Sequence, residues 1–249
     1  LGTCPITRSP ARCTSSRIAV AIGNFSEEPV SLYRVTRATP GDVVFQDDAN
    51  AARVGRATLL PLTFGLLTID ADLDGWCDLV LANGHIEPTV TKIKPEIKYA
   101  QRPQLFRNVE GRRFQEVTAD VGPPFARELV GRGLVAGDLD GDLDLDLVFT
   151  CNGGPPLLAR CDLLAKNRAL RLRLEQPGRN RDAIGAVVRI EAGGVRQRRM
   201  VRTGGSYLSQ GELTLTFGLG MAARADEVIV RWPDGVEQAF GPLDAGAHA

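Results

Sequence analysis

The sequence predicts an all-β protein, with a partial β-propeller followed by a small antiparallel β-domain. Short apolar runs that end at Asn or Gly recur between residues 18 and 162. Glycine, proline and β-branched residues interrupt most windows in which a helix could form, so helix is disfavoured there. After residue 162 several runs alternate strictly between apolar and polar residues, which is typical of half-buried antiparallel strands.

The apolar runs of the first part form an internal repeat. The first run of each unit reads as a buried strand closed by a turn, at Ile18–Asn24, Asp78–Gly84 and Asp146–Gly153. Further runs follow at Ser31–Arg34, Val44–Asp47, Gln104–Arg107, Arg113–Glu116 and Pro156–Arg160. The units recur after about 60 to 70 residues, and repeats of short strands with glycine turns indicate propeller blades.

The second part contains five candidate strands with turn sequences between them. These strands are expected at Leu170–Leu174, Ala186–Ile190, Gln197–Val201, Leu213–Phe217 and Glu227–Arg231. Glycine pairs and a Pro-Asp-Gly sequence supply the turns. We therefore expect a poorly ordered segment at residues 1–17, propeller blades at 18–162 and a β-domain at 163–249.

Composition excludes some classes of function. The 249 residues contain 30 basic and 30 acidic side chains, so no net field attracts nucleic acid. No apolar stretch approaches the roughly 20 residues that span a bilayer. Of the five cysteines, Cys4/Cys13 and Cys151/Cys161 are close enough in sequence for local disulfides in an oxidising compartment, while free thiols in the cytosol remain the alternative.

The first acidic loop, residues 70–78, has carboxylates at its positions 1, 3, 5 and 9 and glycine at position 6. Carboxylates this close repel each other unless a cation lies among them, and oxygen ligands in a flexible loop suit calcium better than magnesium. The predicted ligands are the side chains of four aspartates and the backbone carbonyl of one tryptophan: Asp70, Asp72, Asp74, Trp76 and Asp78. A solvated acidic turn is the alternative.

The second acidic loop, residues 138–146, repeats the pattern with a change in its glycine. Its predicted ligands are Asp138, Asp140, Asp142, Asp144 and Asp146. Glycine stands at position 4 and Leu143 at position 6. A left-handed backbone costs leucine about 1 kcal/mol or more, so we expect this loop to be distorted or to bind calcium more weakly.

No constellation of catalytic or cofactor-binding residues is predicted. Gly131-Arg-Gly133 is the nearest match to a phosphate-binding loop, but it lacks a third glycine and a following helix. His85 and His248 are the only histidines, and no serine or cysteine lies in a nucleophile motif. We expect His85 to make a structural hydrogen bond within its turn, and the basic run at 196–199 to mark an exposed strand edge.

Several motifs resemble a known family. The acidic loops resemble the calcium loops of FG-GAP/VCBS repeats, as in integrin α-subunit propellers. Four later blocks resemble, in order, those of an ASPIC/UnbV domain, and the chain is similar to the cartilage acidic protein-like family; the blocks are Asn180–Ala186, Tyr207–Gln210, Phe217–Gly220 and Val230–Gly235. The resemblance implies a secreted or cell-envelope calcium-binding module for adhesion to a protein or glycan ligand. An auxiliary or catalytic role in a biosynthetic pathway is the alternative.

Overall fold

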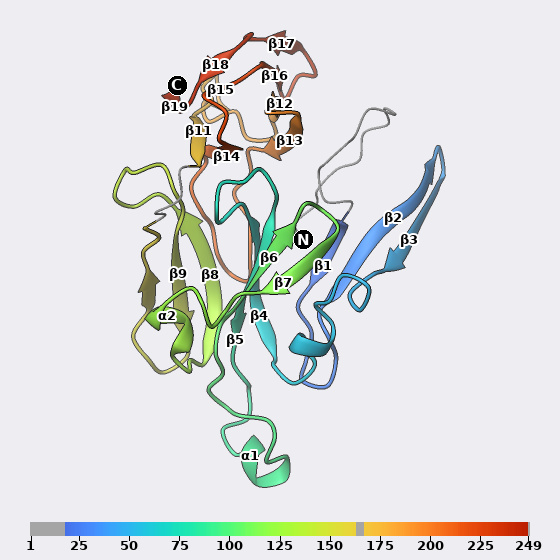
Figure 1. Ribbon diagram of the computed structural model, residues 1–249, viewed down its shortest axis with the longest axis vertical. Helices are drawn as coiled ribbons and strands as arrows, with labels where there is room; N and C mark the ends of the chain where they lie inside the picture. The colour runs from blue at the N-terminus through green and yellow to red at the C-terminus, as the bar shows by residue number, and fades with distance from the viewer. Residues whose placement is uncertain (1–17, 163–166, 249) are drawn as a thin grey trace.

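The computed structural model describes residues 18–162 and 167–248, and within them the fold is all-β, as predicted (Figure 1). The segment 1–17 and the pair Cys4/Cys13 lie outside the described residues. Three antiparallel sheets form the N-terminal part, in the orders β1-β2-β3, β4-β5-β6-β7 and β10-β9-β8. They do not close into a ring within the part that the structure describes, so a complete propeller is absent there.

The three sheets follow the repeat found in the sequence. The first sheet contains β1 (Ile18–Ile22), β2 (Ser31–Thr39) and β3 (Asp42–Asp47). The second contains β4 (Thr63–Ile69), β5 (Asp78–Asn83), β6 (Gln104–Val109) and β7 (Arg113–Glu116). The third contains β8 (Gly131–Gly137), β9 (Asp146–Cys151) and β10 (Leu157–Ala159). Every run that the repeat marks as a strand therefore lies in a strand.

The sheets pack face to face through two apolar cores. Strand β5 is buried along its whole length, and its alternate side chains enter different cores. Leu79 and Leu81 pack with the first sheet, whereas Val80 and Ala82 pack with the third. Because successive side chains of a strand point to opposite faces, a central sheet buried on both faces must be apolar at every position.

Strands β4 and β8 were not among the predicted runs, and both contain glycines. These glycines allow two strands of different sheets to lie against each other. A Cβ added to Gly65 would come 2.8 Å from the Cβ of Leu134 and 2.9 Å from that of Ala82. Gly131 begins β8, so the segment that we compared with a phosphate-binding loop is a strand instead. Glycine inside a strand marks a close approach of backbones here.

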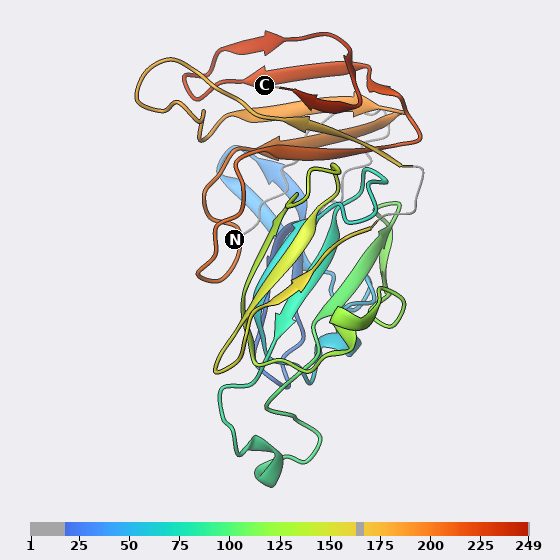
Figure 2. The ribbon, with the colours of Figure 1, turned by 90° about the vertical axis from the view of Figure 1, so that its left-hand side faces the viewer.

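The C-terminal domain, residues 167–248, lies across one end of the three sheets (Figure 2). Its sheets have the orders β14-β11-β19, β13-β12-β16-β17 and β15-β18. The strands are β11 (Arg168–Leu172), β12 (Val187–Ala192), β13 (Val195–Met200), β14 (Leu215–Gly220), β15 (Arg224–Ala225), β16 (Glu227–Arg231), β17 (Glu237–Ala239), β18 (Leu243–Asp244) and β19 (Gly246–His248). One apolar core, with Leu170, Val188, Phe217 and Val230 fully or almost fully buried, joins these sheets.

Helical structure is limited to short turns in the described residues. They are η1 (Arg56–Thr58), α1 (Val90–Ile93) and α2 (Pro123–Ala126). None of these helices has the length and apolar character needed to cross a membrane.

The disulfide that the sequence allows between Cys151 and Cys161 is not formed. Neither cysteine is part of a disulfide, and the same holds for Cys77. Burial, with the nearby Asp144 adding to it, raises the pKa of the Cys161 thiol to about 12, so this sulfur stays protonated at neutral pH.

Candidate metal centre

The two acidic loops occupy equivalent places in the fold. The first joins β4 to β5 and the second joins β8 to β9, so each connects the first two strands of its sheet. In both loops the last aspartate begins the second strand and pairs across the ladder with the final residue of the preceding strand, Ile69 with Asp78 and Gly137 with Asp146. The strand ladder therefore brings position 9 back beside position 1.

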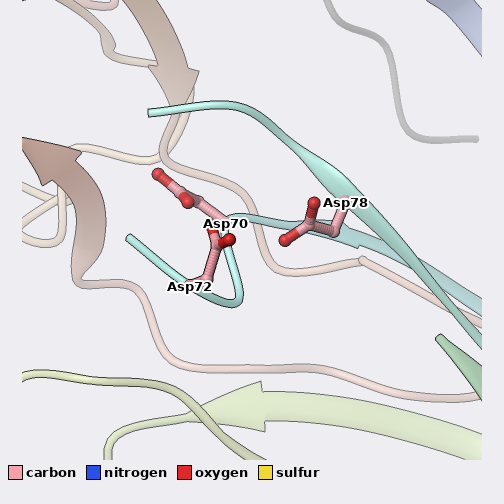
Figure 3. A group of neighbouring side chains, drawn as sticks. All are labelled: Asp70, Asp72 and Asp78. Carbon is pink, nitrogen blue, oxygen red and sulfur yellow. The ribbon is translucent and has the colours of Figure 1, made fainter. Parts of the chain in front are cut away.

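Three of the predicted ligands of the first loop converge. Asp70, Asp72 and Asp78 each offer one carboxylate oxygen within 4.8 Å of the others (Figure 3). The Asp74 side chain does not join this group. Asp74 instead accepts a hydrogen bond of 2.9 Å from the backbone amide of Trp76. The predicted contribution of the Trp76 backbone carbonyl stays a prediction. The indole of Trp76 packs against the backbone at Gly111, where an added Cβ would lie 2.3 Å from the ring.

Backbone amides hold the carboxylates of the first loop in place. Asp78 accepts hydrogen bonds from the amides of Ala71 (2.9 Å) and Asn108 (2.7 Å), one on each oxygen. Asp70 accepts two on its Oδ2 atom, from the amides of Gly75 (2.9 Å) and Gly218 (3.1 Å).

The other oxygen of Asp70, Oδ1, is buried and has no hydrogen-bond partner. The residue as a whole is only 2% exposed. A buried carboxylate oxygen without a partner is costly, because it loses water and gains nothing in return. Three converging carboxylates, one of which has a buried oxygen without a partner, are residues that fit a metal site.

Burial penalises negative charge in this loop. It raises the pKa of Asp70 to about 7, although Arg199 counteracts it, and raises that of Asp78 to about 8. The pKa of Asp74 is raised to about 6, also mainly by burial. Neighbouring aspartates add to each shift. Without a compensating positive charge, these carboxylates bind protons far more readily than exposed ones.

The second loop repeats much of this geometry. Asp138, Asp140 and Asp146 each bring one oxygen within 4.8 Å of the others, whereas Asp142 and Asp144 do not join the group. Asp146 accepts hydrogen bonds from the amides of Leu139 (2.9 Å) and Cys161 (2.8 Å), in the same arrangement as Asp78.

The backbone of the two loops is equally strained, contrary to our expectation. Positions 4 and 6 are left-handed in both, with φ of +57° at Leu73 and +95° at Gly75 in the first loop. In the second loop the angles are +85° at Gly141 and +81° at Leu143. Each loop thus has one glycine and one leucine at its two left-handed positions, in opposite order. Leu143 therefore has the left-handed backbone that the sequence analysis considered, but Leu73 in the first loop bears a similar cost of about 1 kcal/mol. Weaker calcium binding by the second loop stays a prediction.

The C-terminal domain packs directly on the first loop. In addition to the bond to Asp70, the amide of Gly220 donates to the carbonyl of Leu73 (2.9 Å) and the side chain of Asn167 donates to the carbonyl of Asp72 (2.7 Å). A Cβ added at Gly218 would come 2.2 Å from Oδ2 of Asp70, so glycine is required for this approach.

It also contacts the second loop, through charged side chains. Arg171 on β11 lies 2.5 Å from Oδ2 of Asp138 and 2.5 Å from Glu212. Glu212 in turn accepts a hydrogen bond of 3.3 Å from the amide of Asp138. The sequence analysis missed Asn167, Arg171, Glu212 and Gly218, because only the packing of the two parts brings them to the loops.

The fold of the C-terminal domain agrees with a comparison against protein-family models. Residues 176–248 match the family model described as ASPIC and UnbV. This match confirms the resemblance predicted for the C-terminal domain, and the FG-GAP/VCBS repeats stay a prediction. A search of curated proteins found no match to the chain. The strand β11, which precedes the matched residues, shares the apolar core of the ASPIC/UnbV domain.

Two of the four ASPIC/UnbV blocks contact the N-terminal sheets. In the block 207–210, the ring of Tyr207 packs edge-on against Phe64, with centroids 5.0 Å apart, and Ser209 accepts a hydrogen bond from the amide of Leu134. The block 217–220 contains Gly218 and Gly220, which contact the first loop.

The other two blocks organise turns within the ASPIC/UnbV domain. The side chain of Asn180 both donates to the carbonyl of Ile184 and accepts from its amide, which closes a turn. In the block 230–235, the indole of Trp232 donates to Gln238 across a turn that contains Gly235 at φ +92°.

A cavity of about 370 Å³ lies between the N-terminal sheets and the ASPIC/UnbV domain. Its lining includes Ile69, Asp70, Leu134, Arg199 and Thr216.

The basic run at 196–199 lies on β13, which is an edge strand as predicted, but Gln197 within it points inward and is buried. His85 also meets its prediction, since its Nδ1 accepts a hydrogen bond of 3.0 Å from the amide of Glu87.

Proposed function

We propose that this chain is a calcium-binding part of a β-propeller protein, in which the first acidic loop holds the ion. The observation that carries the proposal is the buried Oδ1 atom of Asp70, which has no hydrogen-bond partner and belongs to one of three converging carboxylates. The donor set consists of oxygen alone, in a loop rather than on rigid strands, and this favours calcium over magnesium. The three sheets are interpreted as propeller blades, with FG-GAP/VCBS character, from the repeat and these loops.

The role proposed for the ion is structural. When bound, it supplies the positive charge that lets Asp70, Asp72 and Asp78 remain ionised side by side. The loop then fixes the start of β5 and presents the backbone of Leu73 and Asp72 to the ASPIC/UnbV domain. Metal binding to the folded form alone stabilises that form.

Calorimetric titration with calcium tests this proposal. Wild-type protein stripped with a chelator should bind calcium, in the range of about 10⁻⁴ to 10⁻³ M that is common for extracellular modules. Asp70→Asn removes one charge from the site and should weaken binding about tenfold or more. Asp42→Asn is the matched control, because Asp42 is an exposed aspartate paired with Arg37 far from the loop in sequence. Equal binding by Asp70→Asn and the control would refute the proposed site.

A binding or adhesion role is proposed for the whole module. The connection between β5 and β6 supports it, because this segment carries α1 away from the sheets at the end opposite the ASPIC/UnbV domain (Figure 1). Ile86 is 53% exposed and Ile93 is 74% exposed along this connection. Exposed apolar side chains on a projecting loop suit a protein or glycan ligand.

The proposed location is the extracellular space or the cell envelope. Weak structural calcium sites fill where calcium is abundant, and the resemblance to secreted proteins agrees with this. Cys77, Cys151 and Cys161 form no disulfide in the described residues, so they provide no support for an oxidising compartment.

An auxiliary or catalytic role in a biosynthetic pathway is a second candidate, favoured by the cavity beside Asp70. A titratable side chain with a raised pKa at a cavity between domains is a common feature of active sites. Carbon-detected NMR of the aspartate carboxylates separates the two roles. If Asp70 stays ionised across neutral pH once calcium is added, the structural role holds. A proton that persists near pH 7 in saturating calcium favours the catalytic one.

A further inference from the structure

The two acidic loops differ in what faces the aspartate at position 1. In the first loop, Asp70 has one oxygen bonded to two amides and one buried oxygen without a partner. In the second loop, both oxygens of Asp138 are engaged. Its Oδ1 accepts from the amide of Gly141 at 2.7 Å, and its Oδ2 accepts from the amide of Leu143 at 3.1 Å and lies 2.5 Å from Nη1 of Arg171.

The positive charge beside Asp138 comes from β11, the strand that precedes the matched residues and shares the apolar core of the C-terminal domain. The side chains of Arg171 and Asp138 are 8% and 5% exposed, so the ion pair is removed from water. Arg171 also lies 2.5 Å from Glu212, whose other oxygen accepts from the amide of Asp138. The Nη2 atom of Arg171 donates a hydrogen bond to Glu212, whereas Nη1 contacts Asp138 as an ion pair without a hydrogen bond. A guanidinium in this setting cannot lose its proton.

We propose that Arg171 takes the place of the cation in the second acidic loop, so that this loop is neutralised by the docked ASPIC/UnbV domain and binds no calcium in the intact chain. The inference rests on the proposed function, in which the first loop holds a calcium ion. A second ion would have to share Asp138 with a buried guanidinium, and two positive charges at one buried carboxylate repel each other. Arg107 lies 2.7 Å from Asp72 in the first loop, but its side chain is 51% exposed, so water screens its charge.

A difference in backbone conformation cannot explain a difference in calcium binding between the two loops, and this supports the role of Arg171. Both loops place position 4 and position 6 in the left-handed region, and both bring three carboxylates together. Position 9 is also held by two amides in each loop. The aspartate at position 3 has an arginine nearby in both loops. Arg107 lies 2.7 Å from Asp72, and Arg160 lies 3.9 Å from Asp140.

The inference makes Arg171 a specificity-determining residue. Arg171 decides which of the two similar loops accepts a divalent cation. The negative charge of the second loop is compensated by Arg171 only while the C-terminal domain contacts that loop. Removing the guanidinium would leave Asp138 and Glu212 facing each other with no positive charge from Arg171, and a cation would then be attracted to the loop.

Calcium stoichiometry of the full chain tests the inference. Wild type should bind a single calcium ion, and Asp146→Asn should leave that ion bound, because Asp146 belongs to the second loop. Arg171→Met should gain a second ion, and Arg171→Met with Asp146→Asn should lose it again. Arg171→Lys keeps a positive charge in the same place and should still bind a single ion.

The outcomes separate this inference from the proposed function. If wild type binds two ions and Asp146→Asn binds one, Arg171 does not replace the cation and the inference is wrong, while the proposed function stands. If wild type binds none, the proposed function fails, and a gain of calcium binding in Arg171→Met decides the inference by itself. If Arg171→Met does not fold, as judged by circular dichroism, the comparison of wild type with Asp146→Asn still decides it.

Discussion

Gly218→Ala is expected to disrupt the contact between the first acidic loop and the ASPIC/UnbV domain. The new Cβ would lie 2.2 Å from Oδ2 of Asp70, 2.4 Å from the carbonyl carbon of Leu73 and 2.5 Å from its Cα. Two of these three atoms belong to the backbone of the loop, which cannot rotate away as a flexible side chain could. The backbone of Gly218 is outside the left-handed region, so the cost of the substitution is steric rather than conformational.

The size of the effect follows from two contributions. Overpacking of a buried site costs about 1–3 kcal/mol. Displacing the Gly218 amide from the Asp70 carboxylate adds about 1.5–3 kcal/mol, the usual range for a hydrogen bond to a charged group. Together they predict a loss of roughly 2.5–6 kcal/mol, which for a chain of this length lowers the Tm by roughly 5–24 °C.

Urea unfolding followed by circular dichroism in the presence of calcium measures this loss. Gly204→Ala is the matched control, because Gly204 belongs to the same domain, has no atom within 4 Å of an added Cβ and is not left-handed. The control should unfold at the wild-type midpoint or slightly above it, since alanine restricts the unfolded chain. If both alanine variants share the wild-type midpoint, the close packing of β14 on the loop does not contribute to stability and the reasoning is wrong.

Two further predictions concern charge and backbone in the loops. Burial raises the pKa of Asp70 to about 7 and of Asp78 to about 8, so without divalent cations the folded chain holds more protons than the unfolded chain between about pH 4 and pH 8. In the presence of chelator, the free energy of unfolding should therefore fall as the pH rises through this window, and calcium should remove most of the fall. Equal melting temperatures at about pH 5 and pH 8 in chelator would contradict this. Gly141→Ala forces alanine to adopt φ +85° in open space and should cost about 1 kcal/mol in urea unfolding relative to Gly204→Ala, whereas an unchanged midpoint would show that the turn relaxes freely.

The sequence predicted the strands of the repeat well because their apolar runs are continuous and closed by turn residues. It did not predict β4 and β8, whose glycines Gly65 and Gly131 permit close contact between strands of neighbouring sheets. From sequence alone a glycine can indicate either a turn or a close approach of two backbones, and only the packing of the two sheets distinguishes these roles.

The candidate site was predicted in part for a related reason. Spacing alone indicated that Asp70, Asp72 and Asp78 could share a cation, and the structure brings them together. Spacing could not show that Asp74 turns toward the amide of Trp76, because this depends on the path of the loop. It also could not show Arg171 at Asp138, since 33 residues separate the two in the chain and only the contact between domains joins them.

Trp76 gives the first loop an optical probe of its own. Its ring is 8% exposed and lies on the backbone at Gly111, within the same turn as the three converging carboxylates. The other tryptophan, Trp232, belongs to a different turn in the ASPIC/UnbV domain. Native fluorescence is therefore divided between the two parts of the molecule, and replacing either indole with phenylalanine would let each part be observed without an attached dye.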